Sequence, residues 1–261
     1  MNAKTAGENI GPGYEGVGEF YDLFASNDDI PFFLDYARRQ GSPVLDVAAG
    51  AGRLTLPLAR EGFEVTALEI SPSMLKEFRK RLSREPHDIA ARICLVEGDM
   101  RNFSLDQAYS LIIIPDSFGH AMTSRDQLST LACIRKHLAN RGLFILDFRC
   151  GALLPDHVEF EEPPASLPDG RVVTRRGEIH TDFVNQIMRV DLKYSVHKPH
   201  WAGRDHGRVI EVVSGAAVIY NREADLLVGM SGFVVEQEFG GFDSRPYTSE
   251  CERRVLLLRG R

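Results

Sequence analysis

The chain has 261 residues, of which 43% are hydrophobic and 26% are charged, a composition typical of a globular protein with a full core. Its 31 Lys and Arg residues against 37 Asp and Glu residues give a formal net charge of −6. This balance argues against a general nucleic-acid binder, which needs a net basic face to displace counterions.

Targeting and redox signals in the sequence point to the cytoplasm. No apolar run approaches the roughly 18 residues of a membrane span, and residues 1–13 lack the apolar core of a signal peptide. The four cysteines are scattered and form no CxxC pair, which favours reduced thiols over a disulfide framework. We therefore expect a cytoplasmic protein with no membrane partner and no nucleic-acid partner.

The first part of the chain alternates between short apolar runs and amphipathic stretches. The spacing predicts helices over 28–41, 52–62, 71–85 and 126–142, and strands over 43–47, 64–70, 91–98, 109–115 and 143–148. Ser71 and Pro72 are typical of a helix start, as cap and first helical residue. Near-continuous apolar strands that alternate with helices predict a doubly wound α/β fold, with a mostly parallel sheet covered on both faces.

The pattern changes after Cys150. Residues 151–220 contain no convincing helix but several β-leaning segments, at 170–183, 186–198 and 207–220, with turn-like breaks between them. We expect these segments to form an antiparallel sheet inserted after the fifth strand. A helix over 222–232 and strands over 232–239 and 252–260 then complete a seven-stranded main sheet.

The stretch VLDVAAGAGRLTLPLA, residues 44–59, is the most informative part of the chain. A buried strand runs into a small-residue turn and then a helix, which brings backbone N–H groups close to a ligand. Gly50 and Gly52 match the first two glycines of the dinucleotide fingerprint, but Thr55 occupies the third position, and no P-loop pattern occurs. Asp46 precedes this turn, where its carboxylate would repel a pyrophosphate but suits an ammonium group.

Two further strand ends carry groups that suit a nucleoside. Glu69 follows Gly52 by 17 residues, a position where an acid can accept hydrogen bonds from both ribose hydroxyls. Asp99 ends the third strand and can accept a hydrogen bond from an adenine amino group, while Met74 and Met100 can sandwich the ring. A nucleoside with an ammonium group and no phosphate is S-adenosylmethionine.

The runs DVAAGAG (46–52), EISPSML (69–75) and GDM (98–100) together resemble the class I S-adenosylmethionine-dependent methyltransferases. The resemblance implies a Rossmann-like methyltransferase fold, S-adenosylmethionine as cofactor and S-adenosylhomocysteine as product. Ala48 departs from the family, which usually has glycine there; alanine costs little unless the position needs a positive φ. The resemblance assigns the cofactor to Tyr14, Tyr21, Asp46, Ala48, Gly50, Gly52, Glu69, Ile70, Met74, Asp99, Met100 and Pro115.

Each of these assignments has a structural alternative. Asp46 alone is also compatible with capping the turn that follows it, and Glu69 with a solvated strand end. Met74 is equally compatible with helix packing. The order and spacing of the three runs favour the cofactor interpretation over the sum of these alternatives.

The runs YEGVGEFYDLF (14–24) and SFGHAM (117–122) resemble the bacterial amino-sugar N,N-dimethyltransferases of deoxysugar pathways. A β-rich insertion after the fifth strand is also typical of that group and of glycine N-methyltransferases. In the sugar enzymes a tyrosine of the first run and a histidine of the second lie beside the methyl-transfer centre, and Tyr14 and His120 match them. Asp116 departs from the pattern, because those enzymes tend to have Ser or Phe there.

The chemistry of methyl transfer gives these residues candidate catalytic roles. A neutral amine is nucleophilic but is mostly protonated near neutral pH, so His120 is a candidate to accept its proton, with packing against the cofactor as the alternative. Asp116 is a candidate to orient His120 or hold the substrate ammonium, unless it caps the next turn. Tyr14 or Tyr21 is expected to cover the cofactor, and Arg149 and Trp201 to contact the acceptor.

Histidines after residue 150 raise the question of a metal. The candidates are His180, His197, His200 and His206. His197 and His200 are three residues apart, but the segment 198–207 is loop-like and offers neither a helical frame nor a cysteine partner. We therefore expect no metal site.

These observations predict a methyltransferase that acts on a small molecule, with N-methylation of an amine favoured, such as an amino sugar or another natural-product intermediate. The alternatives are a small-molecule O-methyltransferase and a non-catalytic S-adenosylmethionine-binding protein. Residues 1–150 are expected to form the cofactor core with an N-terminal lid, 151–220 the acceptor cover, and 221–261 the closing helix and strands. A homodimer is the candidate assembly.

Overall fold

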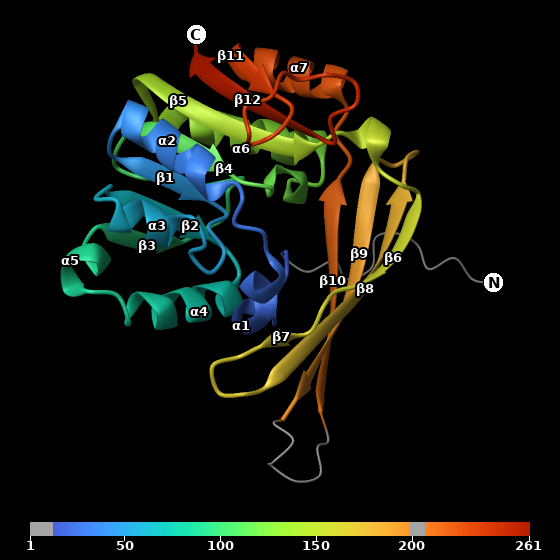
Figure 1. Cartoon of the computed structure of the whole chain (residues 1–261). Coiled ribbons are helices and arrows are strands. Elements are labelled where there is room, and N and C mark those ends of the chain that lie inside the picture. The colour runs from blue at the N-terminus through green and yellow to red at the C-terminus, as the bar shows by residue number, and fades with distance from the viewer. Residues whose placement is uncertain (1–12, 199–206) are drawn as a thin grey trace.

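The computed structural model describes residues 13–198 and 207–261 of the chain. Within these residues, a layered α/β core stands beside a long antiparallel sheet, and the two meet near the carboxyl ends of the core strands (Figure 1). No helix of the described residues is long and apolar enough to cross a membrane.

In the described residues the core sheet has seven strands in the order β11-β12-β5-β4-β1-β2-β3. Their bounds are β1 Val44–Val47, β2 Val65–Glu69, β3 Ile93–Glu97, β4 Tyr109–Ile114, β5 Leu138–Arg149, β11 Phe233–Phe239 and β12 Arg253–Gly260. Only β12 runs against the direction of the others, between β5 and β11. The predicted doubly wound, mostly parallel sheet is confirmed.

Helices cover both faces of this sheet. They are α2 Ile30–Gln40, α3 Thr55–Arg60, α4 Pro72–Leu82, α5 His87–Ala90, α6 Ser124–His137 and α7 Asn221–Met230. Alternate β1 residues serve opposite faces: Leu45 packs with α6 and α7, whereas Val44 packs with α2 and α3. Burial on both faces explains why the core strands are continuous apolar runs in sequence.

Helix starts follow the sequence signals. The Ser71 hydroxyl accepts a hydrogen bond from the Met74 backbone N–H, with Pro72 as first helical residue of α4. Thr123 and Asp126 form a capping box at the start of α6. These caps fix the chain direction immediately after the loops that leave β2 and β4.

Two predicted helix boundaries are wrong, one at the end of a helix and one at the start. The helix predicted over 126–142 stops at His137, because Leu138 already pairs with Tyr109 of β4 and begins a twelve-residue strand. The helix predicted over 52–62 begins only at Thr55, because Gly52 has a φ of 86°, which no α-helix accommodates. Sheet pairing and a ligand-type turn override the helical spacing at these two places.

The second sheet is antiparallel, in the order β10-β9-β8-β6, with β7 paired to β8. Its strands are β6 His157–Glu161, β7 Ala165–Ser166, β8 Val172–Asp182, β9 Ile187–His197 and β10 Arg208–Ala217. The three long strands match the predicted segments, and the short β6 and β7 went unpredicted. One face carries an apolar cluster that includes Val173, Leu192 and Val212, and it packs against the N-terminal residues Val17 and Phe20.

The N-terminal segment forms the short helices α1 (Gly18–Tyr21) and η1 (Asp22–Phe24) and lies against both α4 and the second sheet. A glycine is required at position 18, because a Cβ there would stand 2.4 Å from the Ser73 carbonyl oxygen. Beside β10 and β5, the short turn η2 (Phe118–His120) follows β4, and η3 (Gly151–Leu153) follows β5. The N-terminal segment, η2, η3 and β10 are distant in sequence, and they meet at the carboxyl ends of the core strands, which we call the mouth of the core.

Candidate active site

The turn after β1 holds an unusual backbone conformation. Ala48, Gly50 and Gly52 all have positive φ, of 58°, 58° and 86°. A Cβ on Gly52 would stand 2.7 Å from the Phe78 ring, whereas one on Gly50 would meet nothing within 4 Å. Glycine at 52 is thus fixed by packing, and the backbone at 50 has open space beside it for a ligand.

The backbone conformation of Ala48 shows whether an alanine is costly at this position. An alanine at φ 58° lies in the left-handed region, where a Cβ costs about 1 kcal/mol relative to glycine. Alanine in place of the family's usual glycine therefore has a conformational cost, which the contacts of the surrounding turn must offset. A strained turn next to a buried strand end is typical of a binding site.

Asp46 is buried at the end of β1. Its Oδ2 accepts a hydrogen bond of 2.6 Å from the Thr55 hydroxyl, while Oδ1 has no partner among the described residues. Burial raises the pKa of Asp46 to about 7, an effect that the Thr55 hydrogen bond opposes. A buried carboxylate oxygen without a donor suits a cationic group. The other oxygen of Asp46 accepts from the Thr55 hydroxyl rather than from a backbone N–H of the turn, which argues against the capping alternative.

Glu69, at the end of β2, binds three backbone N–H groups. Its carboxylate accepts from Gly50 at 2.8 Å, from Ile70 at 3.0 Å and from Ser71 at 2.8 Å. Glu69 is only 7% exposed, so the alternative of a solvated strand end is wrong. A carboxylate has about four acceptor positions, so one remains for a ligand hydroxyl.

The third strand end carries Asp99, which Arg101 engages from the same turn. Arg101 Nε lies 2.9 Å and Nη2 2.6 Å from the Asp99 carboxylate, and this pairing lowers the pKa of Asp99. Met100 is half-buried against the core cluster below it. Met74 is 4% exposed, which fits the packing alternative, and Ile70 is 39% exposed beside it in sequence.

The N-terminal segment is tied to the start of α4. Glu15 accepts hydrogen bonds from the Ser71 hydroxyl and from the Ser73 backbone N–H, and Gly16 donates to the Ser73 hydroxyl at 2.9 Å. A carboxylate at a helix N-terminus is favourable because of the helix dipole. These bonds place the segment that contains the candidate lid tyrosines beside the turn after β2.

Tyr14 lies beside Tyr21 and His120. Its ring centroid lies 4.8 Å from that of Tyr21 and 6.0 Å from that of His120, the latter in an edge-to-face arrangement. Burial raises the pKa of Tyr14, and the nearby Asp116 carboxylate adds to this rise. Tyr14 therefore keeps its phenolic proton at neutral pH and can donate it in a hydrogen bond.

His120 is oriented by the second sheet. Its Nδ1 lies 3.0 Å from the backbone carbonyl oxygen of Gly215 in β10. A carbonyl only accepts, so Nδ1 carries a proton and the lone pair of the neutral ring is on Nε2. The structure thus presents His120 in the tautomer that a proton acceptor at Nε2 requires.

Asp116 takes part in a charged network that the sequence did not reveal. Arg253 of β12 binds both the Asp116 carboxylate, at 3.0 Å, and the buried carboxylate of Asp147, and the Asp116 backbone N–H donates to Asp147 at 3.1 Å. Burial raises the pKa of Asp147, and Arg253 opposes that rise. The orienting partner of His120 is thus the Gly215 carbonyl, while Asp116 is held by Arg253.

A signal for this network was present in the sequence. Asp147 interrupts the apolar run LFILDF, and Arg253 and Arg254 precede the apolar run VLLL. A charged residue in a buried strand needs a partner, and the antiparallel pairing of β5 with β12 supplies it. Only that pairing reveals which arginine meets which aspartate.

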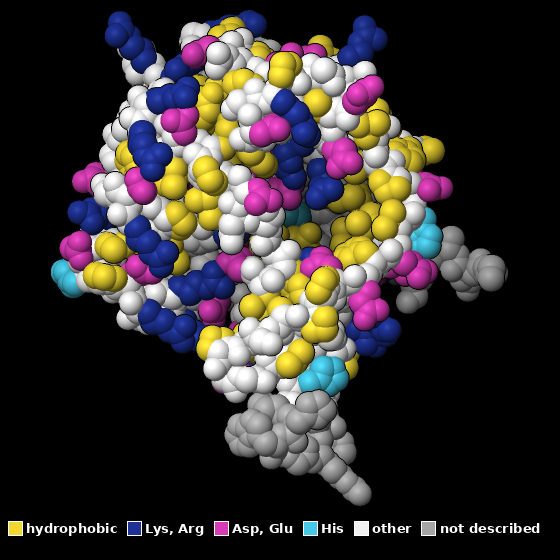
Figure 2. Space-filling view, in the orientation of Figure 1, with side chains coloured by type: hydrophobic (Ala, Val, Ile, Leu, Met, Phe, Trp, Pro, Cys, Tyr) yellow, Lys and Arg dark blue, Asp and Glu magenta, His cyan; other side chains and the backbone are white. Residues whose placement is uncertain are grey.

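Candidate acceptor residues lie around this mouth. Figure 2 shows a hollow between the core and the antiparallel sheet, bordered by basic side chains on the core side and hydrophobic ones on the sheet side. Arg149 is exposed at the end of β5 and lines a pocket of about 470 Å³ together with Asp28, Arg245 and Arg253. Pro115 is half-buried after β4, and Trp201 lies outside the described residues.

Comparison with known proteins agrees with this geometry. Residues 44–142 match the methyltransferase domain family. The chain is 32% identical over 229 residues to the cypemycin N-terminal methyltransferase of a Streptomyces species, covering 84% of this chain and 83% of that protein. It is 26% identical over 240 residues to the dTDP-3-amino-3,4,6-trideoxy-alpha-D-glucopyranose N,N-dimethyltransferase of Streptomyces venezuelae, covering 89% and 91%.

Solved structures show the same fold. The CcbJ methyltransferase from Streptomyces caelestis superposes with a TM-score of 0.76 at 20% identity, covering 96% of this chain and 98% of that one. Matches to two further curated relatives span only 60% and 26% of those proteins' lengths.

The seven-stranded sheet with helices on both faces is the Rossmann-like methyltransferase fold. The chain belongs to the S-adenosylmethionine-dependent methyltransferase family, whose cofactor is S-adenosylmethionine.

Asp46→Asn tests whether the buried carboxylate serves the cofactor. The pKa of Asp46 is raised from 3.8 to about 7, so ionisation of the unfolded chain destabilises the cofactor-free protein as pH rises through this window. The variant escapes this cost, so its advantage in free energy of unfolding grows between about pH 4 and 7, measured by urea titration, while its affinity for S-adenosylmethionine falls. Asp106→Asn, in the exposed loop before β4, should change neither quantity; a stabilised variant with unchanged cofactor affinity would contradict the assignment.

Arg253→Met tests the charged network. Removing one member of a buried ion pair leaves Asp147 uncompensated, and we expect a loss of about 3–5 kcal/mol in the free energy of unfolding at pH 8. The double variant Asp147→Asn/Arg253→Met should recover much of that loss, because the asparagine oxygen still accepts from the Asp116 backbone. Equal stability of the single and double variants would show that the pair does not hold this part of the site.

Proposed function

We propose that the protein transfers the methyl group of S-adenosylmethionine to the amine nitrogen of a small molecule, in particular an amino sugar or another natural-product intermediate. The observation that carries this proposal is His120, whose Nε2 lone pair is left free by the Nδ1 hydrogen bond to Gly215. The relatives support a nitrogen acceptor, since the Streptomyces venezuelae enzyme is named an N,N-dimethyltransferase and a further relative, from Rattus norvegicus, a glycine N-methyltransferase.

The strand ends supply the proposed cofactor contacts. The unpartnered oxygen of Asp46 fits the ammonium group, and the remaining acceptor position of Glu69 fits a ribose hydroxyl. Asp99, Met74 and Met100 are proposed at the adenine. When bound, the cofactor supplies an electrophilic methyl group on a sulfonium.

The remaining cofactor contacts come from small or partly exposed residues. Gly50 and Gly52 keep the turn in its left-handed conformation, and Ala48 shares that conformation. Ile70 and Pro115 stand next to the second and fourth strand ends. Tyr14 and Tyr21 are proposed to cover the cofactor, because the Glu15 and Gly16 bonds hold their segment beside α4.

The chain's own residues then prepare the nucleophile. An amine that arrives protonated is held by the half-exposed carboxylate of Asp116 and gives its proton to Nε2 of His120. Tyr14 remains a neutral phenol and can hydrogen-bond the amine, which helps to aim its lone pair. Positioning in a hollow shielded by the second sheet supplies the rest of the acceleration.

Acceptor specificity is proposed to depend on the insertion and on the rim of the core. Arg149 is a candidate for an anionic group of the acceptor, and Trp201 stays a prediction from the sequence alone. The apolar face of the second sheet offers Ile210 and Val212 toward the N-terminal segment. The cytoplasmic location and the homodimer also stay predictions.

His120→Gln is the central test. The glutamine amide can keep a hydrogen bond to the Gly215 carbonyl but cannot accept a proton, so kcat should fall by about 10²–10⁴-fold. The affinity for S-adenosylmethionine, measured by calorimetry, should stay within a factor of about three of the wild-type value. His87→Gln, an exposed histidine of α5, is the matched control.

Activity is read as S-adenosylhomocysteine release on pairs of acceptors that differ only in an amine or a hydroxyl at the same carbon. Turnover of the amine member supports the proposal. Preference for the hydroxyl member would make the protein an O-methyltransferase. Full kcat in the His120→Gln variant would remove the proton-acceptor role from His120.

A further inference from the structure

Two histidines and a glutamate converge on the second sheet, far in sequence from the strand-end site. His157 belongs to β6, and Glu178 and His180 belong to β8. Val173 and Ile179 of β8 point into the apolar cluster around Val17 and Phe20. Because side chains alternate along a strand, Glu178 and His180 project from the opposite face, away from that cluster.

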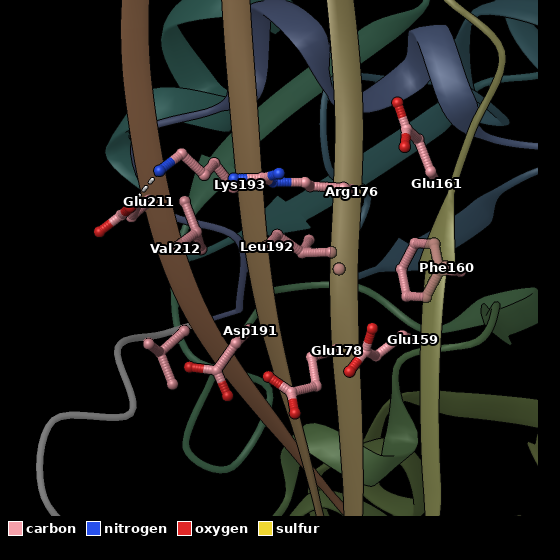
Figure 3. A pocket seen from close by; sticks show the side chains of 12 residues that line it. Glu159, Phe160, Glu161, Arg176, Glu178, Asp191, Leu192, Lys193, Glu211 and Val212 are labelled. Carbon is pink, nitrogen blue, oxygen red and sulfur yellow. Dashed lines mark hydrogen bonds and ion pairs between the residues drawn. The ribbon is translucent and has the colours of Figure 1, made fainter.

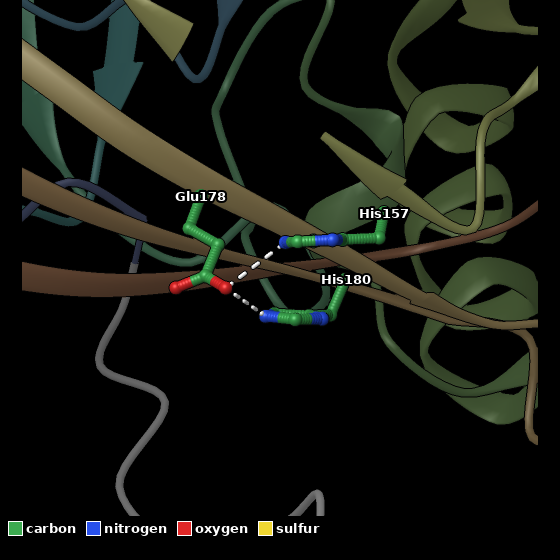
Figure 4. Close-up of side chains that lie close together, drawn as sticks. All are labelled: His157, Glu178 and His180. Atoms are coloured by element: carbon green, nitrogen blue, oxygen red, sulfur yellow. Dashed lines mark hydrogen bonds and ion pairs between the residues drawn. The ribbon is translucent and has the colours of Figure 1, made fainter. Parts of the chain in front are cut away.

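The three side chains share one point in space. His157 Nε2 lies 3.0 Å and His180 Nε2 lies 2.7 Å from the same oxygen, Glu178 Oε1. The two imidazole rings are stacked, with centroids 4.4 Å apart and planes only 8° from parallel. Figure 4 shows both ring nitrogens directed at the one carboxylate oxygen, and the three ligand atoms lie within 4.8 Å of one another.

The register of the sheet explains this convergence. His157 is directly opposite His180, and Glu159 is directly opposite Glu178, which is in turn opposite Asp191 of β9. Three carboxylates therefore form one row across three strands, on the face shown in Figure 3. Like charges directly opposite one another destabilise a sheet, so a cation at this row would be stabilising.

The neighbouring row shows what a balanced arrangement looks like on the same face. There Glu161 stands opposite Arg176, which stands opposite Lys193, and Lys193 pairs with Glu211 at 3.0 Å. Arg189 of β9 also pairs with Asp191 at one end of the acidic row. Glu178, by contrast, stands opposite Glu159 and pairs with the imidazoles of His157 and His180, which are cationic only when protonated.

We propose that His157, Glu178 and His180 bind one divalent transition-metal ion of the zinc class, with Glu159, directly opposite Glu178 in the ladder, as the candidate for a further ligand. Metal–nitrogen and metal–oxygen bonds of about 2.0–2.2 Å require ligand atoms about 2.9–3.4 Å apart. The two nitrogen-to-oxygen spacings, of 3.0 and 2.7 Å, need to open by at most a few tenths of an ångström, and side-chain rotation would turn the two stacked rings toward one ion. Imidazole and carboxylate together suit Zn²⁺ and Ni²⁺ better than Ca²⁺ or Mg²⁺.

The bound ion would join the edge strand β6 to β8. Within the described residues, β6 is a five-residue edge strand whose one ladder is with β8, and Phe160 adds apolar packing on the other face. The site lies on the opposite face from the apolar cluster, so its role is stabilising and separate from methyl transfer. It departs from the sequence expectation of no metal, which rested on the loop-like segment 198–207 around His197 and His200 and did not include His157.

The test uses the full chain without an affinity tag, stripped with a chelator and titrated with Zn²⁺ or Ni²⁺ in a calorimeter. We expect one equivalent per chain, with an affinity lowered by at least about tenfold in each of His157→Ala, His180→Ala and Glu178→Gln. The double variant His200→Ala/His206→Ala is the matched control, since it removes two histidines that are not among the three proposed ligands. Circular dichroism verifies that each variant is folded.

A second readout separates this site from surface adsorption. Saturating Zn²⁺ should raise the Tm of the wild type and of the control double variant, and leave the Tm of the three cluster variants unchanged. Wild-type affinity in His157→Ala and His180→Ala, or loss of binding in the control variant, would overturn the proposal. Absence of binding at metal concentrations up to about 100 μM would overturn it as well, whatever the outcome of the methyl-transfer assays.

Discussion

The buried carboxylate of Glu69 holds the whole cofactor side of the molecule together. One side chain accepts from the loop after β1 and from two residues of the turn after β2. The same turn then binds Glu15 through the Ser71 hydroxyl, which attaches the N-terminal segment. Glu69 thus joins two loops directly, and a second carboxylate, that of Glu15, adds the N-terminal segment to them.

Local sequence patterns predicted much of the fold and named the candidate cofactor residues. Strand and helix periods depend on neighbouring residues, so the parallel sheet and the three long insertion strands were predictable. The start of β5 at Leu138 was not, because it depends on pairing with Tyr109. Sheet pairing is a long-range choice that a local helical pattern cannot reveal.

The residues proposed at the acceptor show even more clearly that local patterns cannot predict long-range contacts. His120 and Tyr14 could be named from short runs, and the structure brings their rings within 6.0 Å. The partners that act on such residues come from far along the chain: Gly215 reaches His120 across 95 residues, and Arg253 reaches Asp147 across 106. Their identity follows from register, so no motif of a few residues can contain it.

The hydrogen bond from His120 ends on a backbone atom, and this matters for how the insertion can diverge. Substitutions along β10 exchange side chains but leave the Gly215 carbonyl in place. The inward positions of β10 can therefore vary with the acceptor while the proton-accepting tautomer is preserved. An insertion or deletion of one residue in β10 would have the opposite effect, since it would exchange the two faces of the strand and withdraw the carbonyl. Related enzymes that differ in acceptor should thus differ on this strand by substitution rather than by length.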